Sequence, residues 1–308
     1  MKISIVIPVF NSSKFTSELL ERLEKYFSLT KYEYELILVD DGSVDNSWDN
    51  LIKISHQKRN IKCIKLLKNY GQHVAVLCGL RNAMGDYCIV MDDDLQNPPE
   101  EIDKLINKSL ETDSDLVFAK FEEKKTSLVR KLGSYATNIL VGKIFNVKRN
   151  IRISNFKLIR KDVVNRVIKF KSSHPYINGI ALMYSKNPQN VLVKHQERKF
   201  GKSNYNIFKI SSLLGTIMFN YSNLPMRILT TIGLIISLIG FLMGAYFFID
   251  KITNQGVYSG WASIFIALCF FSGINLFILG VFGEYIIKIN NQTKLLEQYI
   301  IDEEYPKK

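Results

Sequence analysis

The sequence predicts a doubly wound, mostly parallel α/β sheet, followed by a C-terminal hairpin of two transmembrane helices. Short apolar runs alternate with amphipathic patterns four times over roughly the first hundred residues, as in a parallel α/β sheet. Farther along, residues 228–249 and 261–283 carry no charge and are mainly apolar, and each run is long enough to cross a bilayer once. The mean hydropathy of +0.02 averages over these two contrasting parts of the chain.

A helix signal follows each of the early strands. Ser12 or Ser13 is placed to cap a first helix, and Ser43 or Asp45 is placed to cap a second. Residues 98–101 combine early prolines with acids in the first turn, which is typical of another helix start. The expected strands are residues 3–9, 34–39, 61–67, 87–91 and 115–119, and a longer amphipathic helix is expected over residues 126–145.

Polar residues follow each of the first four strands. Right-handed crossovers place the carboxyl ends of parallel strands at one edge of the sheet, where ligands bind in such folds. We therefore expect four short segments to converge there, namely residues 10–11, 40–41, 68–69 and 92–94.

Three consecutive carboxylates, Asp92, Asp93 and Asp94, end the fourth strand. Side chains alternate along an extended chain, so Asp92 and Asp94 are expected to point the same way and Asp93 the other. Two like charges in one crevice favour a divalent cation, and Mg²⁺ is often held by one or two carboxylates together with substrate phosphates. The alternative is a solvated acidic turn that caps the following helix.

The formal net charge of +12 predicts an anionic partner. Nucleic acid is not expected, because no helix-turn-helix, zinc-finger or RNP pattern accompanies the charge. The basic stretch over residues 143–161 is interpreted either as an anion-binding surface or as a solvated face.

The four cysteines lack metal-ligand spacing and predict buried free thiols in a reducing compartment. The N-terminus enters a strand at once, so no signal peptide is expected.

The two apolar runs predict a multi-pass membrane protein. Basic residues flank both runs, whereas the loop over residues 250–260 has only Lys251, so the positive-inside rule places the N-terminal α/β domain and both termini in the cytoplasm. Buried core helices are the alternative. The expected domains are a cytoplasmic α/β domain at 1–206, interfacial amphipathic helices at 207–226, the transmembrane hairpin at 227–288 and a cytoplasmic tail at 289–308.

An ordered set of motifs resembles the family 2 glycosyltransferases of the GT-A fold, and more narrowly the polyprenyl-phosphate glycosyltransferases. That group contains dolichyl-phosphate mannose synthase and bacterial undecaprenyl-phosphate sugar transferases. The residues at 69–73 and 95–101 are especially similar to the branch that transfers 4-amino-4-deoxy-arabinose derivatives. The segments that carry the resemblance are residues 4–11, 39–43, 69–73, 91–100, 198–205 and 283–285.

The resemblance implies a role for each matching residue. Asp92 and Asp94 would hold Mg²⁺ or Mn²⁺ on the donor diphosphate, and Gln96 would lie near the sugar or acceptor. The implied catalytic residues are Asp92, Asp94, Gln96, Asn155 and Arg198. The implied nucleotide-sugar-binding residues are Pro8, Phe10, Asn11, Asp40, Asp41, Lys68, Asn69 and Asp93. The implied acceptor-phosphate ligands are Lys157, Arg198, Lys202, Ser203 and Tyr205. For Asp40 the alternative is a helix cap with Ser43, and for Arg198 and Lys202 it is attraction to the membrane surface.

Asn155 departs from the family pattern, since many relatives carry an aspartate there that has been proposed as a base. An amide cannot accept a proton at neutral pH. A phosphate monoester acceptor, with a second pKa of roughly 6, is already largely a dianion and needs no base. Asn155 is therefore compatible with activity as an orienting hydrogen-bond donor.

The function implied is inverting, metal-dependent transfer of a sugar from a nucleotide-diphosphate donor to undecaprenyl phosphate, at the cytoplasmic face of a bacterial inner membrane, for cell-envelope glycan modification. Relatives form homo-tetramers, and many act before a separate flippase. Two alternatives are a membrane-anchored transferase with a glycan or protein hydroxyl acceptor, and a catalytically silent scaffold that binds nucleotide-sugars.

Overall fold

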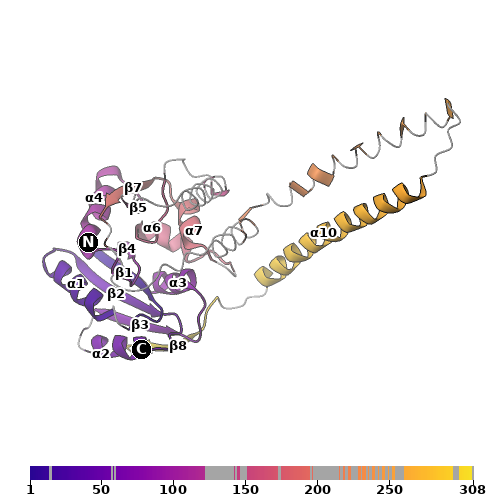
Figure 1. The fold of residues 1–308 in the computed structure, drawn as a ribbon. Coiled ribbons are helices and arrows are strands. Elements are labelled where there is room, and N and C mark those ends of the chain that lie inside the picture. The colour runs from indigo at the N-terminus through magenta and orange to yellow at the C-terminus, as the bar shows by residue number, and fades with distance from the viewer. Residues whose placement is uncertain are drawn as a thin grey trace. The chain divides into compact units, whose positions relative to one another are not determined.

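The computed structural model describes residues 1–121 apart from 14, 15, 57 and 59, then 142, 144, 145 and 151–196 apart from 173, 174 and 195. It also describes scattered positions between 215 and 253, and residues 260–293 and 298–306. The chain forms two compact units, Met1–Ile210 with Leu296–Lys308, and Ser211–Leu295 (Figure 1).

The first unit is built on one mixed sheet, whose described strands run in the order β7-β5-β6-β4-β1-β2-β3-β8. The central strands β4, β1, β2 and β3 are parallel, as the sequence predicts. The other strands join at the two sides, where β6 and β8 run antiparallel to their inner neighbours. The strands are β1 (Lys2–Val9), β2 (Glu33–Asp40), β3 (Ile61–Leu66), β4 (Tyr87–Val90), β5 (Leu116–Phe121), β6 (Lys157–Arg160), β7 (Pro188–Val193) and β8 (Ile301–Tyr305).

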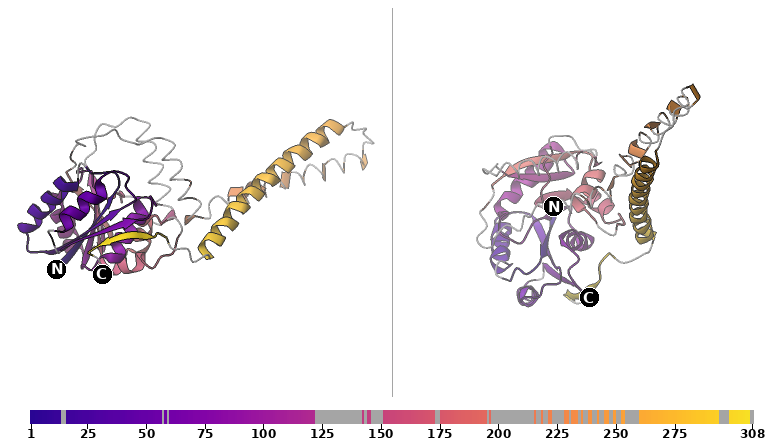
Figure 2. Two further views of the ribbon diagram at one scale, coloured as in Figure 1. Left: turned by 90° about the horizontal axis from the view of Figure 1, so that it is seen from below. Right: turned by 45° about the vertical axis from the view of Figure 1, so that its right-hand side comes forward.

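Helices cover both faces of the sheet (Figures 1 and 2). Helices α1 (Thr16–Ser28), α2 (Ser47–Ser55) and α4 (Ile102–Thr112) pack on the face that receives Ile3, Ile5 and Ile7 of β1. On the other face, α3 (Gln72–Asn82) approaches β1 so closely that a Cβ at Gly79 would lie 2.3 Å from Val6 Cγ1. Helices α6 (Lys161–Val167) and α7 (Ile177–Tyr184) lie beside α3 on this second face, and the short 3₁₀ helix η1 (Pro99–Glu101) precedes α4.

Beyond β4, the sheet differs from the prediction that the fifth strand simply continues it. The fifth predicted strand forms, but β6 lies between β5 and β4 and pairs antiparallel with both. Strand β6 carries the buried lysine Lys157, a residue type that does not indicate a central strand. The helix expected over residues 126–145 lies outside the described residues, apart from positions 142, 144 and 145.

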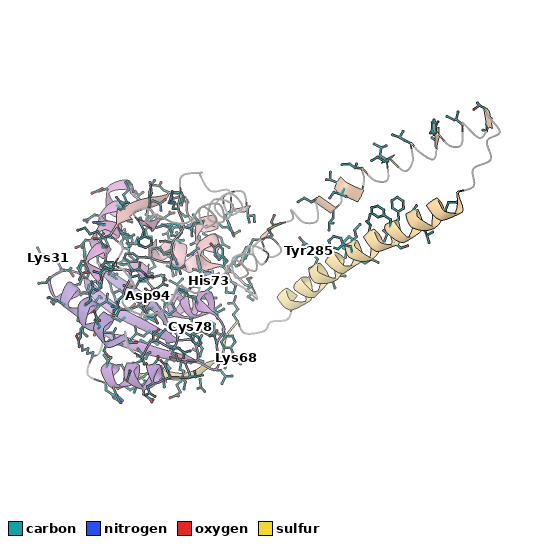
Figure 3. All side chains as sticks on the ribbon, in the orientation of Figure 1. Lys31, Lys68, His73, Cys78, Asp94 and Tyr285 are labelled. Carbon is teal, nitrogen blue, oxygen red and sulfur yellow. The ribbon has the colours of Figure 1, made fainter. Side chains whose placement is uncertain are left out.

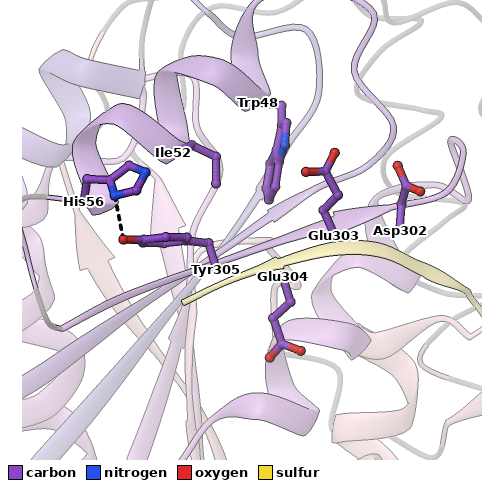
Figure 4. A pocket seen from close by; sticks show the side chains of 7 residues that line it. All are labelled: Trp48, Ile52, His56, Asp302, Glu303, Glu304 and Tyr305. Atoms are coloured by element: carbon purple, nitrogen blue, oxygen red, sulfur yellow. Dashed lines mark hydrogen bonds between the residues drawn. The ribbon is translucent and has the colours of Figure 1, made fainter. Parts of the chain in front are cut away.

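The C-terminal segment forms a sheet strand that the sequence does not indicate. β8 runs antiparallel to β3 along the sheet edge and is the yellow strand in Figure 2. Lys65 of β3 pairs with Glu303 at 3.2 Å, and Tyr305 Oη lies 2.7 Å from His56 Nδ1. A cavity of about 610 Å³ opens between β8 and α2, with Trp48 on its wall (Figure 4). This segment therefore belongs to the first compact unit.

Cys63, Cys78 and Cys88 are free and buried, which confirms the expectation of buried free thiols for these three residues. Burial raises the pKa of the Cys63 thiol to about 12, so it stays protonated at neutral pH.

The second unit contains α10 (Trp261–Thr293), which includes the second apolar run predicted from sequence. Tyr285, labelled in Figure 3, donates from its hydroxyl to the Ser222 carbonyl at 3.3 Å. Within the described part of the chain, no helix combines the length and the hydropathy of a membrane span.

Candidate functional site

A pocket of about 430 Å³ lies at the carboxyl ends of the central strands. Segments that follow β1, β2, β3 and β4 all contribute to its lining, as the strand order predicts. The residues that line it are Pro8, Val9, Phe10, Asp41, Asn69, Gly71, Gln72, Asp92, Asp93 and Asp94. Four aspartates and two residues with side-chain amides, Asn69 and Gln72, therefore line one small volume.

Hydrogen bonds between two loops fix one wall of the pocket. The Asn11 N–H donates to Ser43 Oγ at 3.0 Å, and the Val44 N–H donates to Asn11 Oδ1 at 3.0 Å. Asn11 adopts a φ of 52°, a left-handed conformation that asparagine tolerates better than most residues. Asp40 is buried, and its Oδ1 accepts the Ser43 N–H at 2.8 Å. Asn11 and Asp40 thus support the wall and are not among the residues that line the pocket.

Asp41 supports another part of the lining. Its two carboxylate oxygens accept the backbone N–H groups of Tyr70 at 2.8 Å and Gly71 at 2.9 Å. Gly71 has a φ of 95°, which disfavours any residue with a side chain. The Asp41 carboxylate therefore holds the backbone beside Asn69 against the pocket.

The acidic triplet follows β4 and is half-buried. Burial, followed by the charge of Asp94, raises the pKa of Asp92 to about 6, although Lys157, Asn155 and Gln72 oppose the shift. Burial also raises the pKa of Asp93 to about 7, and the negative charges of its neighbours add to this effect. The Phe10 N–H donates to Asp93 Oδ2 at 3.4 Å, so Asp93 is turned toward the β1 loop. Because these carboxylates lie close together and are partly buried, Asp92 and Asp93 ionise less readily than ordinary aspartates.

Side chains from two elements hold Asp92. Gln72, the first residue of α3, donates from Nε2 to Asp92 Oδ1 at 2.5 Å. Asn155, in the segment before β6, donates from Nδ2 to Asp92 Oδ2 at 3.5 Å. Asn178 of α7 in turn donates from Nδ2 to Asn155 Oδ1 at 3.3 Å. Asp92 is therefore oriented on both of its oxygens.

A buried cation also lies near Asp92. Lys157 is only 2% exposed, and its Nζ lies 3.4 Å from the Asn155 carbonyl oxygen. Burial lowers the pKa of Lys157 to about 7, against the opposing attraction of Asp92. His73, labelled in Figure 3, stacks edge-on against Tyr176 at a ring separation of 5.0 Å. Burial and the neighbouring charge of Lys157 lower the pKa of His73 to about 4, so its ring is neutral at pH 7.

The donor set suits a divalent cation that is shared with a ligand. Asp92 and Asp94 offer oxygen ligands, which Mg²⁺ and Mn²⁺ prefer, and burial together with the neighbouring carboxylates raises the pKa values of Asp92 and Asp93. Among the described residues, no group of three or more His, Cys, Asp or Glu side chains is placed to hold a metal ion. The residues therefore fit a cation whose remaining ligands are phosphate oxygens and water.

Other predicted site residues lie elsewhere. Lys68, labelled in Figure 3, is exposed, and its Nζ lies 5.4 Å above the Tyr70 ring, outside the pocket lining. Gln96 donates its N–H to Asp94 Oδ1 at 3.1 Å, and its carbonyl accepts the Gln196 N–H. The acceptor-loop residues Arg198, Lys202, Ser203 and Tyr205 lie outside the described residues.

Sequence reasoning assigned no role to Gln72, His73 or Asn178. Gln72 and His73 belong to the motif at residues 69–73, and this motif is the sequence signal that could have identified them as site residues. Asn178 is a lone amide within the otherwise apolar helix α7, a pattern that indicates a buried polar contact without naming its partner.

Comparison with known proteins gives the family. Residues 4–170 match the model of glycosyl transferase family 2. The chain belongs to this family. It is 32% identical over 97% of its length to a protein from Photorhabdus laumondii named undecaprenyl-phosphate 4-deoxy-4-formamido-L-arabinose transferase, of which 93% is covered. A protein of the same name from Proteus mirabilis is 31% identical, over 97% of this chain and 93% of the relative.

Solved structures of other proteins share this fold. A glucosyl-3-phosphoglycerate synthase from Mycobacterium tuberculosis in complex with UDP superposes with a TM-score of 0.52 at 16% identity, over 71% of this chain and 78% of that one. The same enzyme with Mn²⁺, UDP-glucose and phosphoglyceric acid gives a TM-score of 0.52 at 15% identity, over 71% and 77% of the two chains. This glycosyltransferase accordingly has a GT-A-like α/β fold with a mostly parallel sheet.

Proposed function

We propose that this glycosyltransferase moves a sugar from a nucleotide-diphosphate donor to undecaprenyl phosphate, with inversion at the anomeric carbon. The observation that carries the proposal is its 32% identity, over 97% of the chain, to a transferase whose name specifies an undecaprenyl-phosphate acceptor. The acidic pocket at the strand ends supports the donor half of the reaction. The sugar of that relative, 4-deoxy-4-formamido-L-arabinose, is the first candidate for this chain.

The pocket is suited to a donor diphosphate. Asp41 accepts the backbone N–H of Tyr70, the residue after Asn69, and Asp41, Asn69, Asp92 and Asp94 line the same volume. A Mg²⁺ or Mn²⁺ ion bound there would act as a Lewis acid and offset charge on the leaving diphosphate. Asp92 and Asp94 would hold that ion, while Gln72 and Asn155 keep Asp92 oriented. Holding donor and acceptor in line lowers the entropic part of the barrier.

The acceptor half needs placement and not a base. A phosphate monoester is largely a dianion at neutral pH, because its second pKa is roughly 6. Asn155 stands where a base would be expected, and its amide donates to Asp92 in place of accepting a proton. This arrangement supports a phosphate acceptor over a hydroxyl acceptor, which would need deprotonation. We infer that Arg198 and Lys202 neutralise the acceptor phosphate.

The membrane arrangement is part of the same proposal. The uncharged runs at 228–249 and 261–283 would form a transmembrane hairpin, and residues 207–226 would lie at the interface of a bacterial inner membrane. The scarcity of basic residues between the runs supports a cytoplasmic location for both termini. A lipid-linked phosphate at headgroup depth would then be accessible to a cytoplasmic catalytic domain. A homo-tetramer and a separate flippase are the partners that the family resemblance implies.

The experiment is a donor panel. The purified full-length protein is incubated with Mn²⁺, undecaprenyl phosphate and a series of nucleotide-sugars that includes UDP-linked 4-formamido-arabinose, and lipid products are identified by mass spectrometry. A new polyprenyl-phosphate-sugar mass is expected with one donor and is expected to disappear with EDTA or in an Asp94→Ala variant. Donor hydrolysis with no lipid product from any donor would contradict the proposal.

A further inference from the structure

A buried amide lies behind the acidic pocket. Asn178 is 4% exposed within α7, whose neighbours in sequence are mainly apolar. Its Nδ2 donates to Asn155 Oδ1 at 3.3 Å, while its own Oδ1 has no hydrogen-bond partner among the described residues. Burying an amide oxygen that has no hydrogen-bond partner is unfavourable. One residue, Asn155, separates Asn178 from the candidate metal ligand Asp92. An unfavourable buried group at this place indicates a role in the site.

The contact with Asn178 fixes which way the Asn155 amide faces. Because Asn155 Oδ1 accepts from Asn178, the Nδ2 of Asn155 is the atom presented to Asp92 Oδ2, at 3.5 Å. The other oxygen of Asp92 accepts from Gln72 Nε2 at 2.5 Å. Each carboxylate oxygen has two lone pairs, so each oxygen keeps one for a further ligand.

We propose that Asn178 is a positioning residue that acts through Asn155 to hold the Asp92 carboxylate in its metal-binding orientation. This inference rests on the proposed function, since it assumes that Asp92 binds the cation shared with the donor diphosphate. It also explains why an amide at position 155 is compatible with the site. A carboxylate there would offer Asp92 an acceptor in place of a donor, and would bring a further negative charge toward the triplet.

Lys157 does not account for the same effect. Its ammonium lies at the Asn155 carbonyl and attracts Asp92 through charge, without a direct hydrogen bond to the carboxylate. Charge alone is not directional, whereas the amide contacts of Gln72 and Asn155 set the rotation of the carboxylate. Neighbouring groups of this kind, which orient metal ligands, typically change metal affinity or activity 10–100-fold when they are removed.

The test measures metal binding apart from turnover. Mn²⁺ affinity of the full-length protein is determined by electron paramagnetic resonance, with whichever of UDP, GDP, CDP and dTDP most strengthens binding by the wild type. Asn178→Leu removes the donor at similar volume and is expected to weaken Mn²⁺ binding about 10-fold. Asn82→Leu is the matched control, because Asn82 bonds to the Cys78 carbonyl at the opposite end of α3. It is expected to leave Mn²⁺ affinity unchanged.

A double-mutant cycle tests whether Asn178 acts through Asn155. In an Asn155→Ala background, adding Asn178→Leu is expected to cause no further loss of Mn²⁺ affinity, since contacting residues are not additive. Asn155→Asp provides a second variant in case Asn178→Leu does not fold, and is expected to reduce both Mn²⁺ affinity and turnover about 10-fold or more.

Three results would overturn the inference: unchanged Mn²⁺ affinity in a folded Asn178→Leu variant, fully additive losses in the cycle, or higher turnover in Asn155→Asp. The last result would identify position 155 as a lost base. If the variants lose Mn²⁺ affinity as expected but the wild type makes no polyprenyl-phosphate-sugar, the positioning role is supported and only the acceptor assignment is contradicted. Absence of Mn²⁺ binding by the wild type with every nucleotide would overturn the inference directly.

Discussion

The carboxylate of Glu35 ties the start of β2 to two other segments, and its replacement gives a sharp stability test. Glu35 Oε1 accepts from Ser4 Oγ at 2.5 Å and from the Met84 N–H at 2.7 Å. Its Oε2 pairs with Lys2 Nζ at 2.6 Å. Burial raises the pKa of Glu35, but the contacts from Lys2, Ser4 and Met84 outweigh it, and the net pKa lies below the ordinary value.

Glu35→Gln keeps the shape and removes the charge. Two charge-assisted hydrogen bonds become neutral ones, at about 1 kcal/mol each, and the half-exposed pair with Lys2 adds at most about 1 kcal/mol. We expect a loss of about 2 kcal/mol near pH 7, which corresponds to a Tm lower by about 4–8 °C for a unit of this size. Thermal unfolding of the full-length protein in detergent, followed by fluorescence, measures this shift.

The pH dependence gives the refuting result. Because the pKa of Glu35 is depressed in the folded protein, its stabilising effect is complete above the unfolded carboxylate pKa of about 4.3. It is lost as the pH falls through the folded-state pKa. The Tm difference between wild type and Glu35→Gln should therefore shrink as the pH falls below about 4.3. A difference that stayed constant as the pH was lowered through the acid range, or no difference near pH 7, would show that the carboxylate charge does not stabilise the fold.

Three further predictions follow from packing and buried charge. Gly79→Ala introduces a Cβ only 2.3 Å from Val6 Cγ1. The overpacking costs about 1–3 kcal/mol, whereas the higher helix propensity of alanine gains roughly 1 kcal/mol. We therefore expect Tm to fall in this variant and to recover when Val6→Ala is added. A Tm that rises in the single variant would contradict this packing argument. Lys157→Met is expected to lower turnover about 10-fold through loss of the cation beside Asp92. Full turnover would show that the charge is dispensable. Asp115→Ala should lower Tm without changing donor affinity. The buried Asp115 carboxylate accepts three hydrogen bonds from residues 185–187 and is not part of the pocket lining. Weaker donor binding with an unchanged Tm would contradict this prediction.

The central sheet and the pocket could be predicted because their determinants are local. Strands β1 to β4 are short apolar runs that each end in polar residues, and crossover handedness brings those ends together. Phe10, Asp41, Asn69 and the acidic triplet are accordingly found in one pocket. The motif at residues 69–73 also indicated this edge of the sheet.

The remaining features depend on contacts that no local pattern encodes. β8 pairs with β3 across more than two hundred residues of intervening chain, and its charged sequence does not resemble a buried strand. β6 carries a buried lysine, which is interpretable only once Asp92 is known to lie nearby. Asn178 likewise gains its meaning from a partner in another element.

The central claim, transfer to a lipid phosphate, is tested most directly by comparing two acceptors that differ in one group. The full-length protein, Mn²⁺ and the active nucleotide-sugar are incubated with either undecaprenyl phosphate or undecaprenol, and the lipid products are identified by mass spectrometry. The account predicts a glycosylated product from undecaprenyl phosphate alone, because a phosphate acceptor is already largely a dianion and Asn155 provides no base. Equal glycosylation of undecaprenol, or of neither lipid while the donor is consumed, would contradict it.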